Sequence, residues 1–567
     1  MHRPMPRVET REMVGSRLDR SALAVVVVLI AALSIELYDF ARAQDIWLDE
    51  ATQLSGLSLK FWQMLQWLGG VDPGGLGVPG DRTPPLVYLL DWSWRRLFGP
   101  SELGLRLFHS AFVVAGISCL AAVSWREVGR SATIVWVGFL VLSPKLVQAG
   151  VEIRAYALFF GITCAQTAVF LRLAACPKVN LRLLAVFVAL CLLAIYTHFY
   201  GVVSVCAFFL ALGISRLRRS APLADIIGAF AAVVIGSLGL VPFVLGAAQV
   251  SGALFVPASS TGIEFAPRST GQYLSYLLKL VGDPANMISI PASLLFFCGT
   301  IALLCAGIFA AMVRARNAKS KPVDWCNVVV ASGVLATIVA GLLVSVRTFD
   351  ALRTSYSIWL LVPFSLLVGA GATTVTGFRL WDVAGSRLAA GAVMLGAGMS
   401  TFGFLSHAGE FVHGPHRFIA ALYDKAAGPK AIVYDNGALW GWSFVPLQYS
   451  HHGKVVQYRT TKDGRGLVRA GGRDAKATIQ DMQSTIAAYR VLLLTDIRTR
   501  SYRDLRQCQN QPAACPGFPS SALAAALTGT GQWREIGKER SLGFYDAQVT
   551  VLERSESDPQ GLVRHQD

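Results

Sequence analysis

The stretch SALAVVVVLIAALSI at residues 21–35 contains no charged residue, and similar apolar runs recur along the chain to about residue 406. A helix needs about 20 such residues to cross a hydrocarbon core about 30 Å thick. Of the 567 residues, 53% are hydrophobic and 15% are charged, against about a quarter charged in a soluble domain. We therefore predict a polytopic α-helical membrane protein. The first run follows a basic tail (1–20) and lacks an obvious small-x-small cleavage site, so we expect a retained membrane helix instead of a signal peptide.

Lys and Arg gather in short loops between the apolar runs, and this pattern predicts the orientation, because cytoplasmic loops carry an excess of these cations. The clusters are Arg3, Arg7, Arg11, Arg17 and Arg20; Arg126 and Arg130; Arg172, Lys178 and Arg182; Arg216, Arg218 and Arg219; Arg314, Arg316, Lys319 and Lys321; Arg379 and Arg387. If all of these clusters are placed on the cytoplasmic side, successive loops alternate consistently between the two sides of the membrane, and the N-terminus is cytoplasmic. The net charge of +16 belongs to these loops, and the sequence has no nucleic-acid motif, so we expect membrane lipids and no nucleic acid as partners.

The apolar runs predict eleven crossings. They cover about 21–40, 103–124, 131–150, 155–172, 182–197, 200–215, 223–248, 288–312, 325–346, 355–376 and 387–406. An odd number places the C-terminal region outside. The runs at 182–197 and 200–215 are short, and merging them would invert everything downstream. The cation clusters after residue 215 argue against merging.

The predicted parts are a cytoplasmic basic tail (1–20), a transmembrane domain (21–406) and an outer, periplasmic soluble domain (407–567). The first outer loop, 41–102, is long. Its segment LKFWQMLQWL (59–68) combines tryptophans with a modest apolar face, which is typical of a helix lying in the membrane interface. The following segment, GGVDPGGLGVPGDRTPP (69–85), is rich in Gly and Pro and is expected to be irregular.

Residues 407–567 have a different composition and lack an apolar run long enough to span a membrane. Short β-like segments are AIVYD (431–435), KVVQY (454–458), RVLLLTD (490–496) and FYDAQVTVLE (544–553), with a helical stretch at 477–490. Strands interleaved with helices predict a small α/β domain. Cys508 and Cys515 flank a polar stretch in this region. They would form a disulfide in an oxidising compartment, and two free thiols are the alternative.

Ionisable and hydrogen-bonding residues gather near one predicted membrane edge, the outer one. They are Asp49, Glu50, Arg82, Glu152, Arg154, Tyr156, His198, Arg347, Arg353 and Tyr356. Charged groups at a membrane edge are costly and are therefore functional candidates. Arginines can hold a phosphate by bidentate hydrogen bonds, and a carboxylate can take a proton from an attacking hydroxyl.

Six segments carry a resemblance to a known superfamily. They are WLDEA (47–51), TPPLVYLL (83–90), LFGPSELGLRL (97–107), SPKLVQAGVEIRAYAL (143–158), YTHFYG (196–201) and RTSYSIWLLVP (353–363). Their order and spacing over roughly residues 20–370 resemble the C-type (GT-C) glycosyltransferases. More narrowly, the chain resembles the protein O-mannosyltransferase and aminoarabinose-transferase-like bacterial membrane enzymes.

The resemblance implies an inner-membrane hexosyl- or pentosyltransferase. Such an enzyme moves a sugar, with inversion, from a polyprenyl-phosphate donor to a periplasmic glycan, lipopolysaccharide, lipid or protein acceptor. It implies Asp49 as the base and Glu50 as a supporting or acceptor-orienting residue. Donor-binding candidates are Arg82, Glu152, Arg154, Tyr156, His198, Arg353 and Tyr356, with Glu152 orienting Arg154 or contacting the sugar. It also implies chemistry without a metal or other cofactor.

Simpler interpretations stand beside these roles. One is that Asp49 and Glu50 cap the helix that follows, since acids favour helix N-termini. Another is that Glu152, Arg154 and His198 are solvated loop residues and that Arg347 and Arg353 are interfacial anchors. Asp45 and Asp49 are in principle able to share a cation, whereas His413–His416 and His451–His452 match no strong zinc spacing and are interpreted as structural. The rival functions are a transporter or flippase of lipid-linked sugars and a non-catalytic envelope assembly protein.

Overall fold

The computed structural model describes most of the N-terminal half of the chain and parts of the C-terminal half. The described residues are 9–71, 80–176, 178–218, 221–254, 358–376, 414–434, 458–460, 467–469, 475–477, 479–499, 508, 521–541 and 545–555. The predicted crossings at 288–312, 325–346 and 387–406 lie outside these residues. So do the predicted site residues Arg353 and Tyr356, together with Arg347, His413, His451, His452 and Cys515.

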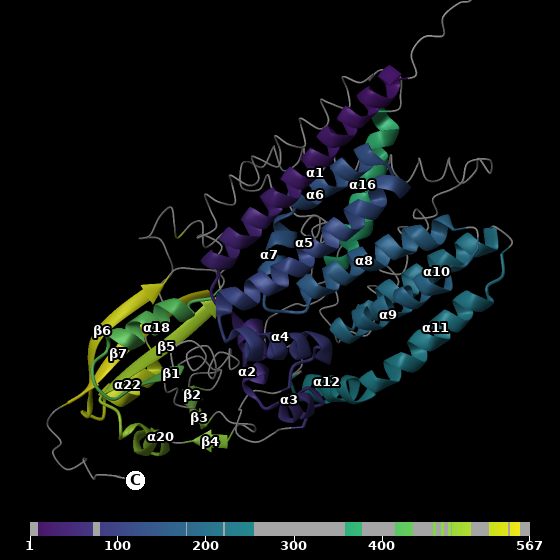
Figure 1. Ribbon diagram of the computed structural model, residues 1–567. Coiled ribbons are helices and arrows are strands. Elements are labelled where there is room, and N and C mark those ends of the chain that lie inside the picture. Colours follow the sequence, from purple (N-terminus) through teal and green to yellow (C-terminus); the bar gives the residue numbers. More distant parts are fainter. Residues whose placement is uncertain are drawn as a thin grey trace, which may run out of the picture.

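The described residues form a multi-pass helical membrane protein (Figure 1). Within them, four helices are long and apolar enough to cross a membrane, at Ala22–Ala43, Glu102–Glu127, Tyr156–Ala174 and Ala224–Gln249. They belong to α1 (Glu9–Ala43), α5 (Glu102–Glu127), α8 (Tyr156–Ala175) and the run of α11 (Ala224–Ser237), η1 (Leu238–Leu240) and α12 (Val241–Leu254). The predicted total of eleven crossings remains a prediction.

The predicted single helix at 131–150 is wrong in one respect, because two helices replace it. α6 (Arg130–Val141) and α7 (Pro144–Val151) meet at a bend of 66°. Pro144 lacks an N–H and is therefore favoured in the first turn of a helix. The Ser143 hydroxyl accepts a hydrogen bond from Leu146 N at 3.3 Å and so caps α7. Together they start a new helix where the apolar run alone predicts continuity.

Shorter apolar helices complete the bundle. They are α9 (Leu181–Thr197), α10 (Gly201–Arg218), η4 (Ile358–Leu360) and α16 (Leu361–Thr376). α9 and α10 are separate elements joined by a tight turn, in which Gly201 N donates to His198 O at 2.7 Å. In Figure 1 the helices α9, α10 and α11 lie side by side.

The first predicted loop is helical. It contains α2 (Leu48–Ser58), α3 (Phe61–Leu68) and α4 (Pro85–Phe98). The predicted amphipathic helix at 59–68 is confirmed as α3, in which Trp67 and Leu68 are buried while the Trp62 side chain is 73% exposed. The capping interpretation of Asp49 and Glu50 predicts a helix at the position of α2, whereas α4 is not predicted from the sequence. α2 contacts both α3 and α4, and it carries Asp49 and Glu50 in its first turn.

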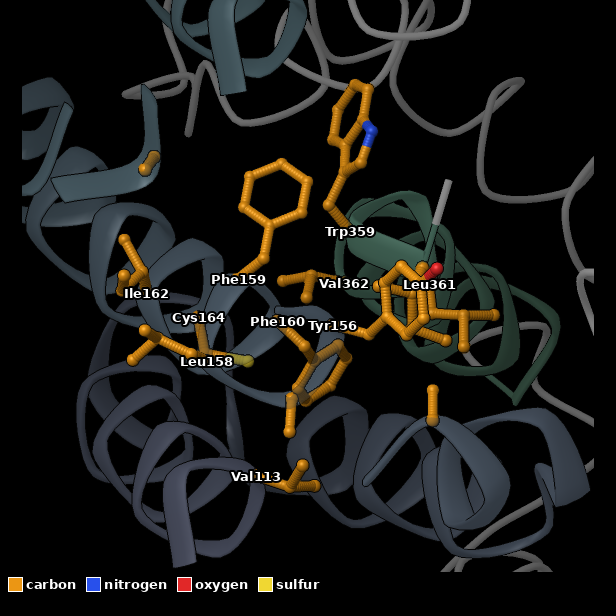
Figure 2. Packing of buried hydrophobic residues seen from close by; sticks show 14 of the residues in the cluster. Val113, Tyr156, Leu158, Phe159, Phe160, Ile162, Cys164, Trp359, Leu361 and Val362 are labelled. Atoms are coloured by element: carbon orange, nitrogen blue, oxygen red, sulfur yellow. The ribbon is translucent and has the colours of Figure 1, made fainter. Parts of the chain in front are cut away.

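The centre of the bundle is an apolar core made where α5, α8 and η4–α16 meet. Figure 2 shows Val113 of α5, Phe159 and Phe160 of α8, and Trp359 and Val362 gathered there, and all five are buried. α5 and α8 approach so closely that a Cβ added to Gly116 would lie 2.7 Å from the Gly161 Cα. Small residues of this kind let membrane helices pack backbone to backbone.

The C-terminal region is an α/β structure, as predicted. One sheet has the order β1-β5-β7-β6, with β1 and β5 parallel and the other pairs antiparallel. Its strands are β1 (Lys430–Tyr434), β5 (Val491–Thr499), β6 (Trp533–Ser541) and β7 (Tyr545–Arg554). A small antiparallel sheet contains β2 (Tyr458–Thr460), β3 (Leu467–Arg469) and β4 (Ala475–Ala477).

Helices cover both faces of the larger sheet, because its buried strands are apolar on both sides. α18 (His416–Lys425) packs on the face that carries Ile432 and Leu493. α20 (Ile479–Ile486) and α22 (Ala522–Thr528) pack on the face that carries Val433 and Leu492. Cys508 is buried and disulfide-bonded, and its predicted pairing with Cys515 stays a prediction.

Candidate active site

Glu50 is fully buried at the start of α2, and both of its carboxylate oxygens are occupied. Oε1 accepts from Arg106 Nη1 at 2.6 Å and from Ile153 N at 2.9 Å. Oε2 accepts from Arg106 Nη2 at 2.8 Å and from Trp47 N at 3.3 Å. The capping interpretation therefore describes Glu50 well: its carboxylate closes the first turn of α2 and anchors that turn to α5 and to the α7–α8 loop.

Asp49 precedes Glu50 and has a different environment. Its side chain is partly exposed, and its backbone carbonyl accepts from Arg154 Nη1 at 3.2 Å. This contact joins two predicted site residues that are 105 positions apart in the sequence. The main chain of Asp49 therefore meets the Arg154 guanidinium, and its carboxylate is near enough for the two charges to interact.

Arg154 forms a buried ion pair with Asp81, which the sequence interpretation did not select. Nη1 lies 2.5 Å from Asp81 Oδ2, and Nη2 donates to Thr83 Oγ1 at 3.2 Å. The Tyr88 hydroxyl donates to the same Asp81 oxygen at 2.7 Å. Burial alone would raise the pKa of Asp81, but the Arg154 guanidinium and the Tyr88 hydroxyl hold that pKa below its ordinary value. Asp81 is therefore a carboxylate that neutralises Arg154.

Glu152 is buried, and within the described residues its Oε2 has no hydrogen-bond partner. Burial raises its pKa to about 7, Lys145 opposes that rise, and the nearby carboxylates of Glu50 and Asp49 add to it. The Arg154 guanidinium binds Asp81, Thr83 and the Asp49 carbonyl, and the predicted roles of Glu152, orienting Arg154 or contacting the sugar, stay predictions. Glu152 therefore has hydrogen-bonding capacity that the described fold leaves unused.

His198 lies in the turn between α9 and α10, over the start of α8. Its ring stacks on Phe159 with centroids 5.4 Å apart and lies 6.0 Å from the ring of Tyr156. Its Nδ1 faces the Tyr200 backbone N–H at 3.1 Å and so accepts a hydrogen bond. Burial and the nearby Arg154 charge lower the pKa of His198 to about 3, so the ring is neutral and its proton is on Nε2.

The structure brings together most of the predicted site. Hydrogen bonds and charge interactions connect four of its members around the N-terminus of α2: Asp49, Glu50, Glu152 and Arg154. His198 lies near Arg154, and its ring is close to that of Tyr156. Arg82 follows Asp81 directly, and its side chain is exposed. Arg353 and Tyr356 are outside the described residues, although η4, which begins at Ile358, packs against α7 and α8.

A second buried polar cluster lies behind the site and was also missed. Asp91 of α4 accepts from Gln53 Nε2 at 2.6 Å and lies 2.9 Å from His109 Nε2 on α5. All three side chains are fully buried. An ionisable residue inside an otherwise apolar segment is the sequence signal that marks His109, as it marks Arg106. That signal does not identify Asp91 as the partner of His109.

Among the described residues, no group of three or more His, Cys, Asp or Glu side chains is arranged to hold a metal ion. The Asp45 carboxylate, which the sequence analysis considered as a possible co-ligand of Asp49, binds backbone N–H groups of Ile46 and Arg417 instead. His416 is buried in the C-terminal region at the start of α18.

The described helices have the arrangement of the GT-C fold, as the sequence resemblance predicts. Two solved structures of ArnT from Cupriavidus metallidurans have this fold. The apo structure matches with a TM-score of 0.53 at 14% identity over 92% of this chain and 97% of that chain. The structure bound to undecaprenyl phosphate matches with a TM-score of 0.51 at 14% identity over 94% and 99%.

An oligosaccharyltransferase from Archaeoglobus fulgidus, in its apo form, matches with a TM-score of 0.46 at 11% identity over 76% of this chain and 64% of that chain. No protein-family model matches the sequence, and no curated protein matches it. At 14% identity, the likeness to the two ArnT structures shows the fold alone.

Proposed function

We propose that this protein is an inverting glycosyltransferase that moves a sugar from a polyprenyl-phosphate donor to a cell-envelope acceptor. The observation that carries the proposal is the contact between Asp49 and Arg154 at one edge of a GT-C fold. One of the similar ArnT structures is bound to undecaprenyl phosphate, which supports a lipid-phosphate donor of the same kind.

Asp49 is the proposed base. The acceptor hydroxyl must lose a proton as it attacks the anomeric carbon from the face opposite the phosphate. Asp49 suits this step because its side chain is partly exposed, whereas the adjacent Glu50 is buried and occupied by Arg106. Glu50 is accordingly proposed to support the position of Asp49 without touching the substrate.

The departing lipid phosphate gains negative charge, which cations stabilise. Arg154 is already neutralised by Asp81, so it is proposed to orient the site while the exposed Arg82 meets the phosphate. Arg353 remains a candidate for the same role. His198 is neutral and carries its proton on Nε2, so its contribution is proposed to be an uncharged hydrogen bond, next to Tyr156.

Glu152 is proposed to bind the donor sugar. A carboxyl group whose pKa is about 7 is present in both protonation states near neutrality, so it can donate a hydrogen bond to a sugar oxygen or accept one from a sugar hydroxyl. The reaction is proposed to need no metal or other cofactor, since the chemistry requires one base and a stabilised phosphate leaving group.

The placement is proposed to be the bacterial inner membrane, with a cytoplasmic N-terminus and the site and C-terminal region on the periplasmic side. The acceptor class is a glycan, a lipopolysaccharide, a lipid or a protein. A transporter or flippase remains the second candidate. Transporters commonly bind substrate near the bilayer midplane at broken helices, and the bend between α6 and α7 is the observation that favours it.

Purified protein incubated with a panel of undecaprenyl-phosphate-linked hexoses and pentoses and with envelope extracts tests the proposal, with sugar transfer read by mass spectrometry. Asp49→Asn should lose at least about 100-fold in transfer, because a general base contributes roughly that much. The matched control is Glu127→Gln, at the far end of α5, which should retain transfer. Unchanged transfer by Asp49→Asn would overturn the assignment of the base, and movement of donor across vesicles without transfer would favour the transporter.

A further inference from the structure

The start of α18 in the C-terminal region contacts the short linker between α1 and α2. Asp45 in that linker is 4% exposed, and its Oδ2 accepts from the backbone N–H of Arg417 at 2.7 Å. The residues are 372 positions apart. A helix N-terminus leaves backbone N–H groups without helical partners, and a side-chain oxygen normally caps them from the same chain segment. Here the cap comes from the membrane part of the protein.

The same contact brings two backbones together. A Cβ added to Gly414 would overlap the carbonyl group of Ile46, so no residue with a side chain fits there without displacing the linker. Trp47, the next residue, packs against the apolar cluster that includes Ile419 and Ala420 of α18. The linker is therefore held on one side by α18, and Trp47 is also the N-cap residue of α2.

A chain of charged contacts leads from α18 to the first turn of α2. The Arg417 guanidinium donates to the Arg42 carbonyl at 3.0 Å and lies 3.5 Å from Glu102. Glu102 lies 2.9 Å from Arg106, and Arg106 lies 2.6 Å from Glu50. Glu50 is the immediate neighbour of Asp49. Two routes thus connect α18 to the proposed base: the backbone of the linker and these three ion pairs.

We infer that this joint, formed by Asp45, Gly414 and Arg417, holds Asp49 in its place, so that the C-terminal region is a positioning part of the active site. The inference rests on the proposed role of Asp49 as the base. Asp45 and Arg417 touch neither substrate in this scheme and act through α2. The geometric demand is strict, since misplacing a reacting group by about 1 Å can cost on the order of 100-fold in rate.

The test compares Asp45→Asn and Arg417→Gln with the wild type in full-length protein. Arg417→Gln leaves the backbone N–H to Asp45 in place and changes a side chain that is 51% exposed, so this variant should fold. The matched control is Arg534→Gln, an exposed arginine of the same region that pairs with Glu553 at 3.3 Å. Amide hydrogen exchange across α2 and turnover with whichever undecaprenyl-phosphate sugar is active are measured.

The joint predicts exchange across α2 at least about fivefold faster in both variants, and turnover lowered by a similar factor while the KM for the donor is unchanged. Arg417→Lys should recover part of the loss. The loss in Arg417→Gln combined with Glu102→Gln should be smaller than the product of the single losses, because both changes break one chain of contacts. A purely structural role would lower the unfolding temperature without slowing turnover per folded molecule, and that result would overturn the inference.

The two proposals fail separately. If Asp49→Asn abolishes transfer while Asp45→Asn and Arg417→Gln behave like Arg534→Gln, the joint is wrong and the proposed base stands. If Asp49→Asn transfers sugar normally, the assignment of the base is wrong. In that case, normal hydrogen exchange across α2 in Arg417→Gln would also show that the joint does not hold α2 in place.

Discussion

Asp49 and Glu50 are adjacent carboxylates in different environments. The Glu50 side chain is fully buried in an ion pair with Arg106, while Asp49 keeps a partly exposed side chain beside Arg154. Sequence alone places both at a helix start, where either one suits a cap. The burial of Glu50 depends on Arg106, which is 56 positions away, and for this reason the sequence alone does not show that Glu50 is held in an ion pair.

The first prediction is that Glu50→Gln destabilises the protein far more than Asp49→Asn. Breaking a buried ion pair by removing one charge costs about 3–5 kcal/mol, whereas a change at a partly exposed side chain usually costs no more than about 0.5 kcal/mol. Thermal unfolding in detergent measures both. Equal unfolding temperatures for the two variants would contradict the assignment of Glu50 to structure.

The second prediction concerns Asp45 and pH. Burial raises its pKa from 3.8 to about 7, Glu102 adds to the rise, and the Arg417 and Ile46 N–H groups oppose it. Because the folded pKa exceeds the unfolded one, the folded state binds the extra proton, and the associated stability is lost as pH rises from about 4 through 7.

Between pH 5 and pH 8 the wild type should therefore lose at most about 3 kcal/mol relative to Asp45→Asn, at about 1.4 kcal/mol per pKa unit. Unfolding temperatures of the two proteins across this range give the difference. A difference that stays constant, or that comes to favour the wild type at high pH, would show that the pKa of Asp45 is not raised in the folded protein.

At the scale of elements, α2 is attached by two buried polar contacts that lie one turn apart. Glu50 binds Arg106, and Gln53 binds Asp91, which also contacts His109. The partners Arg106 and His109 are themselves three residues apart on α5, which places them on the same side of that helix. The Glu50–Arg106 and Gln53–Asp91 contacts together fix both the tilt and the rotation of α2.

The third prediction tests the contact between Asp91 and His109. His109→Leu removes the contact between His109 and the buried Asp91 and leaves the one with Gln53, and a buried group that loses a hydrogen bond costs about 1–3 kcal/mol. Ser93→Ala, at an exposed position of α4, is the control and should change stability by less than about 0.5 kcal/mol. An unfolding temperature for His109→Leu equal to that of the control would contradict the proposed importance of the cluster.

The elements themselves were predictable where a long apolar run or a strong local pattern exists. α1, α5, α8, α9 and α10 follow from run length, and α3 from its tryptophans and apolar face. α4 was missed because LDWSWRR interrupts its apolar character with charges whose burial depends on tertiary contacts, as for Asp91. The apolar run at 131–150 predicts one helix, whereas Ser143 and Pro144 form a local helix-start signal that divides the run into α6 and α7.

At the scale of the whole molecule, the sequence predicts that distant segments meet at one membrane edge, and the Asp49–Arg154 contact agrees with this geometry. The buried partner Asp81 and the contact of α18 with Asp45 were not predictable, since they join segments 73 and 372 positions apart. No local pattern encodes such pairings.

The fourth prediction concerns topology. Alkaline phosphatase fused after residue 567 should be active and the same enzyme fused after Arg130 inactive, because its disulfides form only in the oxidising periplasm and the Arg126–Arg130 cluster is predicted to be cytoplasmic. Green fluorescent protein at the same positions should give the reverse pattern. An active fusion after Arg130 would invert the predicted orientation.

The close packing of Gly116 against Gly161 has a consequence for how such a site can change. α5 brings Arg106 and α8 begins at Tyr156, and the two helices touch through bare backbone with no space for even one methyl group. The distance between α5 and α8 is therefore set by backbone atoms, which no substitution can make smaller. If the proposed donor site accepts a bulkier sugar, the added space would come from α2, α3 and α4, where the Trp67 and Tyr88 side chains pack around Gly56.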